Sequence, residues 1–146
     1  KILDGIGTID ENKQRFPQII DKLSNPHRCY FEDYNIMVNS GVKINGLCHI
    51  TGGGLVENVK RVLSDNFKIQ YINGAPYNYP EEFTFLQKYG GVTDDEMIKV
   101  FNCGIGMLVF VDSKTLEETN VIKTLCDYHT PNYARVIGRV VSSDLE

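Results

Sequence analysis

The feature that most constrains this chain is a run of three glycines at positions 52–54, set between two segments of different periodicity. Residues 47–50 have the pattern of a short strand, and residues 55–63 place apolar side chains at helical spacing on one face. A strand, a glycine-rich loop and a helix N-terminus bring free backbone N–H groups and the positive end of the helix dipole together. This arrangement favours an anion site, although a flexible turn would use the same glycines.

Thr51 and the three glycines, Gly52, Gly53 and Gly54, are therefore the candidate phosphate-binding residues. Glycine permits positive φ and lets a phosphate approach the backbone closely, and the Thr51 hydroxyl either donates to the same anion or caps the helix. The loop has neither the Gly-Lys-Ser/Thr end of a Walker motif nor a GxGxxG dinucleotide pattern. The motif indicates phosphate without specifying the ligand.

Polar residues near this unit are further candidates. His49 stands at the carboxyl end of the predicted strand, where ligands bind in α/β sheets, and is either a general acid or base or a packed histidine bonded to a backbone carbonyl. Asn102 either faces the same pocket or ends a helix. Arg28 is a candidate for phosphate contact or a solvated surface residue. His27 and His129 are weaker candidates, and His129 is expected in a surface loop.

Acidic and thiol side chains give no metal site. The acidic run at residues 94–96 follows Thr93 and ends in a glutamate three positions on, which is a capping box that begins a helix. The four cysteines form no CxxC pair, and Cys48 and His49 are neighbours that a strand would turn to opposite faces. We therefore predict no metal ligand and interpret the cysteines as reduced thiols of a cytoplasmic protein.

Charge and hydropathy exclude two classes of partner. Fifteen Lys and Arg against nineteen Asp and Glu give a net charge of −4, and no basic run exceeds Lys60-Arg61, so we expect no nucleic-acid partner. The longest apolar run, at residues 107–111, is far below the roughly 18–20 residues of a membrane span, so we expect no membrane association. Residues 1–5 do not resemble a secretory signal.

Periodicity and turn signals predict alternating helices and strands. Helices are expected over residues 11–23, 55–63 and 81–89, after Thr93, and from Asp112 to about residue 128. Strands are expected over residues 47–50, 67–72, 105–111 and 134–141. Residues 28–31 are β-prone, and residues 36–38 could form either a helix or a strand. Residues 105–111 suit a central strand, and Asn45-Gly46 is a turn signal. This alternation predicts a mixed β-sheet flanked by helices, of the α/β or the α+β class.

Several blocks closely resemble signatures of the aminoimidazole ribonucleotide synthetase family, also called phosphoribosylformylglycinamidine cyclo-ligase. The first is HITGGGLVENVKRVL at residues 49–63, and the second joins DEM to FNCGIGM within residues 95–107. PHRCY at residues 26–30 is similar to a third block, with His27 where the family more often has Thr, and VIGRV at residues 136–140 resembles the closing strand. Independent blocks in one order make the resemblance specific.

The resemblance implies a division into domains. Residues 1–24 are expected to be a linker and an N-terminal helix, and residues 25–146 the C-terminal domain of this family. The chain resembles only that half of a two-domain enzyme, because the ATP-binding N-terminal half has no counterpart in it. The family fold of this half is a mixed sheet flanked by helices, in agreement with the periodicity.

The resemblance also implies an ATP-dependent ring closure in purine biosynthesis. ATP would phosphorylate the formyl oxygen of formylglycinamidine ribonucleotide. The amidine-side nitrogen would then attack the formyl carbon and expel phosphate, giving 5-aminoimidazole ribonucleotide. Thr51, the glycines and Arg28 would contact phosphate, and His49 and Asn102 would lie beside the reacting groups. Mg²⁺ would accompany ATP, bound mainly by the other half. The full-length protein would be a homodimer, and the isolated domain an inactive monomer.

Two alternatives stay open. Related enzymes of the superfamily make formylglycinamidine ribonucleotide, selenophosphate, thiamine diphosphate or the hydrogenase cyano ligand on the same architecture, although the two main blocks together favour the cyclo-ligase. The second alternative is a catalytically silent, stand-alone domain that binds a phosphorylated ligand or a partner protein.

Overall fold

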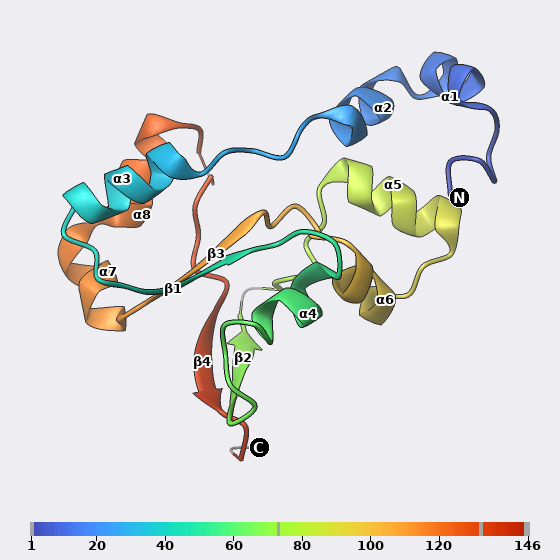
Figure 1. Cartoon of the computed structure of the whole chain (residues 1–146). Coiled ribbons are helices and arrows are strands. Elements are labelled where there is room, and N and C mark those ends of the chain that lie inside the picture. Colours follow the sequence, from blue (N-terminus) through green and yellow to red (C-terminus); the bar gives the residue numbers. More distant parts are fainter. Residues whose placement is uncertain (1, 73, 132, 145–146) are drawn as a thin grey trace.

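The structure, a computed structural model, describes residues 2–72, 74–131 and 133–144. Along this part of the chain the elements are, in order, α1 (Ile9–Arg15), α2 (Pro17–Ser24), α3 (Phe31–Asn39), β1 (Ile44–His49), α4 (Gly54–Val59), β2 (Phe67–Tyr71), α5 (Glu81–Gly90), α6 (Asp94–Val100), β3 (Met107–Val111), α7 (Ser113–Thr119), α8 (Val121–Tyr128) and β4 (Gly138–Ser142). Figure 1 shows α1, α2 and α5 at one end, α3, α7 and α8 at the other, and the strands between them.

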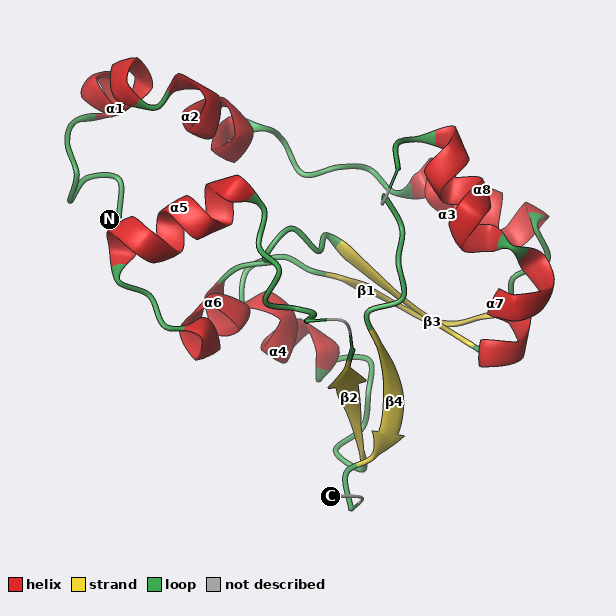
Figure 2. Cartoon of the chain, turned by 180° about the vertical axis from the view of Figure 1, so that it is seen from behind, coloured by secondary structure: helices red, strands yellow, loops and turns green. Residues whose placement is uncertain are grey.

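The strands form two separate antiparallel pairs within the described residues. β1 pairs with β3, which places His49 opposite Met107, and β2 pairs with β4, which places Tyr71 opposite Gly138. Figure 2 shows the β2–β4 pair extending away from the β1–β3 pair toward the C-terminus. The expected single mixed sheet is therefore wrong, and so is a central position for residues 105–111. An apolar run indicates a buried strand, but it does not show that the strand has a neighbour on each edge. Helices packed on the faces of a strand can bury the same side chains.

Two expected helices are each divided in two. Residues 11–23 belong to α1 and α2, with a break at Phe16, whose φ of −136° and ψ of 51° are not helical. Pro17 explains this break, because proline lacks the N–H of a helix hydrogen bond and disfavours helical backbone in the preceding residue. α7 and α8 are divided at Asn120, whose φ of 49° is left-handed, a conformation that asparagine adopts more readily than most residues.

The cap signals of the sequence are confirmed. The Thr93 hydroxyl accepts the Glu96 N–H, and the Glu96 carboxylate accepts the Thr93 N–H, so the acidic run begins α6 as a capping box. The Asp112 carboxylate accepts the Lys114 N–H at the start of α7. These helix starts depend on neighbours within three residues, which is why a local pattern identifies them.

Two local predictions need adjustment. The segment at 36–38, helix or strand by periodicity, lies within α3, which already begins at Phe31, so the β-prone stretch before it forms no strand. The turn expected at Asn45-Gly46 is wrong, because both residues lie inside β1, where the pairing with β3 is irregular.

The apolar interior is divided into two clusters. One lies between α3 and α8 and contains Met37, Val42, Val121 and Leu125; the other lies where β1, β3 and α4 meet and contains Cys48, Ile50, Leu55 and Leu108. The chain exposes 9586 Å² of surface, whereas a compact chain of this mass exposes roughly 7,500 Å². The β1–β3 pair takes part in both clusters, with Cys48 and Leu108 in one and with Ile44 and Val109 packed against the other.

The described helices contain between 6 and 10 residues. Within the described ranges, no helix has the length and apolar character needed to cross a membrane.

Candidate functional site

β1 ends at His49, whose side chain faces away from the apolar cluster. Cys48 is 3% exposed within the cluster, whereas His49 is exposed, as the alternation of a strand predicts. His49 lines a groove of about 1380 Å³ together with Arg28, Tyr30 and side chains of β3 and β4. His49 and Arg28 are therefore both accessible from the same groove.

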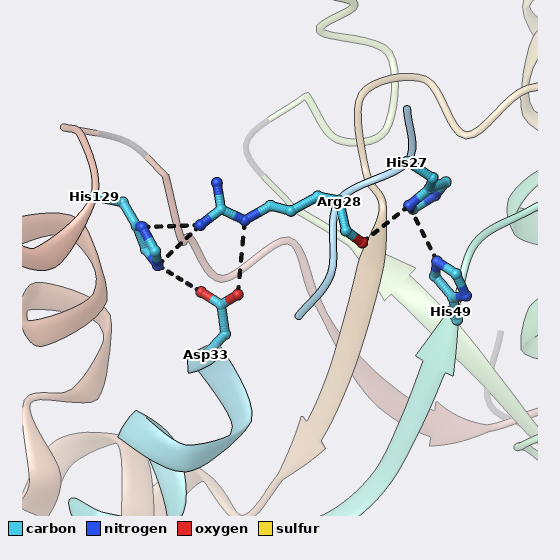
Figure 3. Close-up of polar contacts among 5 residues, drawn as sticks. All are labelled: His27, Arg28, Asp33, His49 and His129. Carbon is cyan, nitrogen blue, oxygen red and sulfur yellow. Dashed lines mark hydrogen bonds and ion pairs between the residues drawn. The ribbon is translucent and has the colours of Figure 1, made fainter. Parts of the chain in front are cut away.

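A second histidine contacts the first. His49 Nε2 lies 3.1 Å from His27 Nδ1, and the two rings meet edge to face, with centroids 4.3 Å apart and an interplanar angle of 82°. The other nitrogen of His27, Nε2, lies 3.1 Å from the Ile50 carbonyl oxygen. The Tyr30 ring lies 6.0 Å from the His27 ring and 6.1 Å from the His49 ring. His27, a weak candidate by sequence, is thus a direct partner of His49 (Figure 3).

Gly106 leaves the space that these rings occupy. A Cβ atom at this position would lie 1.9 Å from the Tyr30 hydroxyl oxygen and 3.1 Å from His27 Cε1. The first distance is far below the 3.0 Å that real Cβ contacts keep, so a side chain here would displace the Tyr30 ring from its place beside the histidines. The Gly106 carbonyl also accepts the Ile50 N–H at 2.9 Å, which extends the backbone pairing beside the rings.

Arg28 points away from its neighbour His27, toward α3 and α8 (Figure 3). Its Nη2 lies 2.9 Å from His129 Nδ1, and its Nε lies 3.8 Å from Asp33 Oδ2. His129 Nε2 lies 2.7 Å from Asp33 Oδ1, and these two side chains are only 10% and 7% exposed. His129 lies in the loop after α8, as predicted, but as the C-cap of that helix it turns its side chain inward onto a buried carboxylate of α3.

The proton positions in this cluster follow from its contacts. An ionised carboxylate only accepts, so His129 Nε2–H donates to Asp33, and the lone pair on His129 Nδ1 accepts a hydrogen bond from Arg28. The Arg28 guanidinium also lies over the Tyr133 ring, 4.7 Å from its centroid. Burial raises the pKa of Tyr133, and its interaction with the Asp33 carboxylate raises it further. Arg28 is thus held in place, while 43% of its side chain stays exposed.

Two of the three glycines in the loop have packing roles. Gly53 is the N-cap of α4 with a φ of 93°, and the buried Gly54 has a φ of 58°. A Cβ on Gly54 would lie 2.3 Å from the Ile98 carbonyl oxygen, so α4 approaches the backbone of α6 more closely than a side chain would allow. Buried Asn58 donates from Nδ2 to the Gly54 carbonyl at 2.7 Å and to the Gly52 carbonyl at 3.3 Å.

The open part of the loop is formed by Thr51 and Gly52. Both are exposed, and a Cβ at Gly52 would meet no atom within 4 Å. The N-cap of α4 makes no side-chain hydrogen bond, so Thr51 does not cap this helix. Among the described residues, no backbone carbonyl accepts the N–H of Gly52 or Gly53. The loop therefore offers two backbone donors next to an exposed hydroxyl.

Asn102 takes part in a local turn. Its Oδ1 accepts the Gly104 N–H at 3.0 Å, and its carbonyl accepts the Ile105 N–H at 2.8 Å. The C-cap of α6 is Phe101 in extended conformation, and Cys103 has the left-handed φ, so the interpretation of Asn102 as a left-handed C-cap is wrong.

The sequence candidates fall into two groups. His49 and Arg28 line the groove, whereas Thr51, the glycine loop and Asn102 are not among its lining residues. Sequence reasoning missed Asp33 and Asn58. A signal existed for Asn58, because it stands four residues after Gly54 and a helix turns such a side chain back toward the loop.

Within the described ranges, side chains that could ligate a metal meet only in smaller groups than a metal ion needs. Across the part of the chain that the structure describes, no group of three or more His, Cys, Asp or Glu could hold a metal ion. We place no magnesium ligand on these residues.

The amino-acid sequence matches a protein family over nearly its whole length. A family model described as AIR synthase related protein, C-terminal domain, matches residues 4–146. The chain therefore belongs to the AIR synthase related proteins. The match also includes most of residues 1–24, the segment for which the sequence blocks suggested no relationship.

Individual relatives carry a more specific name. The chain is 38% identical over 120 residues to phosphoribosylformylglycinamidine cyclo-ligase of Bacillus subtilis, which covers 82% of this chain and 33% of the relative. It is 37% identical over 114 residues to the protein of that name from Citrifermentans bemidjiense, and the match covers 78% of this chain and 32% of the relative. The Burkholderia cenocepacia protein of the same name is 43% identical over 95 residues, covering 65% and 26%. The chain thus spans about a third or less of each of these relatives.

Proposed function

We propose that this chain is the C-terminal part of an ATP-dependent phosphoribosylformylglycinamidine cyclo-ligase of de novo purine biosynthesis. The observation that supports it most is a family match over residues 4–146, which includes the blocks around His49, the glycine loop and Asn102. The reaction would close the imidazole ring of formylglycinamidine ribonucleotide to give 5-aminoimidazole ribonucleotide, ADP and phosphate.

The groove offers two of the functions that this ring closure needs. A proton acceptor must take the proton of the attacking nitrogen, and donors must hold phosphate oxygens. His49, exposed in the groove, is assigned the first function, since imidazole exchanges protons near neutral pH. Arg28 is assigned the second, because Asp33 and His129 hold its guanidinium while part of it stays open to the groove.

The glycine loop is assigned a separate phosphate. The backbone N–H groups of Gly52 and Gly53 and the Thr51 hydroxyl would donate to it, and glycine at position 52 leaves room for close approach. Because the loop does not line the groove, its phosphate differs from the one that Arg28 contacts. Asn102 would present its amide N–H₂, since its oxygen is already bonded to Gly104.

A Gly52→Ala variant tests the loop assignment. The added methyl meets no atom of the chain, so folding should be unchanged, while close approach of a phosphate is blocked. Loss of one hydrogen bond to a charged group predicts substrate binding weaker by about 10- to 100-fold, measured by calorimetry. Unchanged affinity in the folded variant would remove the loop from the phosphate site. Gly53→Ala is a poorer test, because a φ of 93° strains alanine.

The remaining parts of the proposal concern the longer protein. ATP and Mg²⁺ are assigned mainly to its N-terminal half, residues 1–24 to a linker with N-terminal helices, and residues 25–146 to the C-terminal domain. We further propose a homodimer of the full-length protein and an isolated domain that is monomeric and inactive. The four cysteines are free thiols, which supports a location in the cytoplasm.

The decisive experiment is turnover by the complete natural polypeptide that contains this chain. It is supplied with formylglycinamidine ribonucleotide, ATP and Mg²⁺, and formation of 5-aminoimidazole ribonucleotide is followed. Product that depends on ATP is the expected result, and His49→Ala should lower kcat by about 10²- to 10⁴-fold. A well-folded polypeptide without product would overturn the proposal.

A second candidate is a catalytically silent domain that binds a phosphorylated ligand. The two free N–H groups of the glycine loop favour it, because binding needs only this loop. Ligand binding that Gly52→Ala abolishes, in a complete polypeptide that makes no product, would support this candidate. Product from a different substrate would instead identify a sister enzyme of the superfamily.

A further inference from the structure

We propose that His27 is a positioning residue for His49. Its Nδ1 accepts the Nε2–H of His49, which leaves the lone pair on His49 Nδ1 free to take a proton from a ligand in the groove. The inference rests on the proposed function in one respect, because His49 is the proton acceptor assigned there. By sequence, His27 was only a weaker candidate for the site.

The first step is the protonation of His27. Its Nε2 lies 3.1 Å from the Ile50 carbonyl oxygen, which only accepts hydrogen bonds, so Nε2 carries the hydrogen. A neutral imidazole has one N–H, and Nδ1 of His27 is therefore the acceptor. The Ile50 carbonyl is well placed for this, because Ile50 is fully buried and its N–H is bonded to Gly106.

The protonation of His27 determines which nitrogen of His49 carries the hydrogen. His27 Nδ1 lies 3.1 Å from His49 Nε2 and 3.4 Å from the Arg28 carbonyl oxygen. The carbonyl oxygen cannot donate, so His49 Nε2 is the donor that satisfies the lone pair. His49 then has its own lone pair on Nδ1, the nitrogen that makes no contact with His27.

The third step is the rigidity of the pair. Three segments that are distant in sequence meet here: residues 26–30, the end of β1 and the turn before β3. The rings are nearly perpendicular, and Gly106 leaves the space that His27 and Tyr30 fill. His49 is therefore held in one orientation as well as in one tautomer, which is what a general base at a fixed substrate nitrogen requires.

The hydrogen bond can be observed directly in the ¹⁵N-labelled 146-residue chain by NMR. At a pH of about 8.5, where free histidine is neutral, we expect both rings protonated at Nε2 and a scalar coupling between His49 Nε2 and His27 Nδ1 across the hydrogen bond. A His49 ring protonated at Nδ1, or a His27 ring protonated at Nδ1, would overturn the assignment.

Two isosteric variants separate this role from packing. His27→Asn keeps a hydrogen-bond acceptor, Oδ1, near the position of the His27 Nδ1 atom. The leucine of His27→Leu has nearly the same shape as that asparagine but no acceptor. His27→Leu should speed exchange of the His49 Nε2 proton with water about tenfold and mix the two tautomers, and His27→Asn should restore the native spectrum. Equal exchange rates in the native chain and His27→Leu would contradict the proposal.

The same pair of variants in the complete polypeptide tests the consequence for turnover. His27→Leu should lower kcat by about 10- to 100-fold with KM unchanged, as outer-shell partners of functional histidines do, and His27→Asn should recover most of it. An active native enzyme whose His27→Leu variant keeps full kcat would refute the positioning role. An inactive native enzyme would refute the proposed function instead, while the NMR result stands independently.

Discussion

The glycine loop and the histidine pair lie on opposite sides of one buried residue, Ile50, but they are held by different forces. On the loop side, Gly54 packs against the backbone of α6, and the loop carbonyls are bonded by buried Asn58. On the histidine side, exposed His27 and His49 are joined by a single hydrogen bond at the edge of a groove. The first region is mainly packing, and the second is mainly polar contact near solvent.

This difference separates two kinds of sequence signal. A run of glycines suggests a ligand, yet at two of the three positions the backbone conformation and close packing already account for the residue. The histidines give little local signal, yet they meet where a ligand can reach them. Substitution of the packed Gly54 should therefore lower stability, whereas substitutions at the exposed Gly52 and at the histidine pair should mainly change binding or catalysis.

Gly54→Ala should have the largest effect on stability. The added Cβ would lie 2.3 Å from the Ile98 carbonyl oxygen, and a φ of 58° is unfavourable for alanine. Left-handed strain of about 1–2 kcal/mol and overpacking of about 1–3 kcal/mol predict a free energy of unfolding lower by about 4 kcal/mol, measured by urea denaturation.

Gly52→Ala is the matched control in the same loop. Its Cβ meets no atom within 4 Å, so the free energy of unfolding should change by less than about 1 kcal/mol. Equal destabilisation by the two variants would show that the loop is not packed against α6 as described.

Asp33→Ala should have the next largest effect. Its carboxylate is 7% exposed and is bonded to His129, with the Arg28 guanidinium beside it. Removing this carboxylate leaves the His129 imidazole N–H without its acceptor and the Arg28 guanidinium without its neighbouring negative charge. Breaking a buried charged network predicts a loss of about 3 kcal/mol in the free energy of unfolding, measured by urea denaturation with an unchanged m-value.

Glu32→Ala, the neighbouring position on α3, is the control. Glu32 is exposed, so removing its carboxylate should cost less than about 1 kcal/mol. If Asp33→Ala costs no more than this, the polar cluster on the histidine side contributes no more to stability than a surface charge.

Cys103 should have no effect on stability through its ionisation at neutral pH, and an effect only at alkaline pH. Burial beside α6 raises the pKa of this thiol to about 11, and its Sγ contacts the Met97 carbonyl oxygen at 3.5 Å. In the unfolded chain a thiol ionises near pH 8.5, so between about pH 9 and pH 11 the unfolded state binds fewer protons than the native state. The free energy of unfolding should therefore fall with rising pH, by at most about 1.4 kcal/mol per pH unit from this group.

The measurement compares urea denaturation of the native chain and of Cys103→Ala between pH 8 and about pH 11. The variant should lose part of the alkaline slope, because the group responsible is absent. If the free energy of unfolding of the native chain and of Cys103→Ala falls in parallel with pH, Cys103 ionises equally in the native and the unfolded state. Its thiol would then be open to water in the native state.

Much of the local structure could be predicted because it depends on residues close in sequence. The capping boxes at Thr93 and the cap at Asp112, the strand before the glycine loop and the opposite faces of Cys48 and His49 are all confirmed. The break at Phe16 was also within reach, because Pro17 stands directly after it. A 3.6- or 2-residue period reports such features without knowledge of the fold.

The arrangement of the site was decided by tertiary structure. Asp33 and His129 are 96 positions apart, and His27 and His49 are 22 apart, so no local period links either pair. Strand pairing is equally non-local: β1 pairs with β3 and β2 with β4, although the same apolar patterns are compatible with one mixed sheet. Which strand edges meet depends on how the intervening helices pack, and that is a property of the whole chain.

The amino-acid sequence by itself therefore determined the family and the helix starts at Thr93 and Asp112, and it supplied candidate site residues. Tertiary structure decided which of these residues meet, separating the glycine loop from the groove and joining His27 to His49. The physical reason is range: caps and periodicity act over a few residues, whereas a hydrogen bond between side chains needs their segments to be packed side by side.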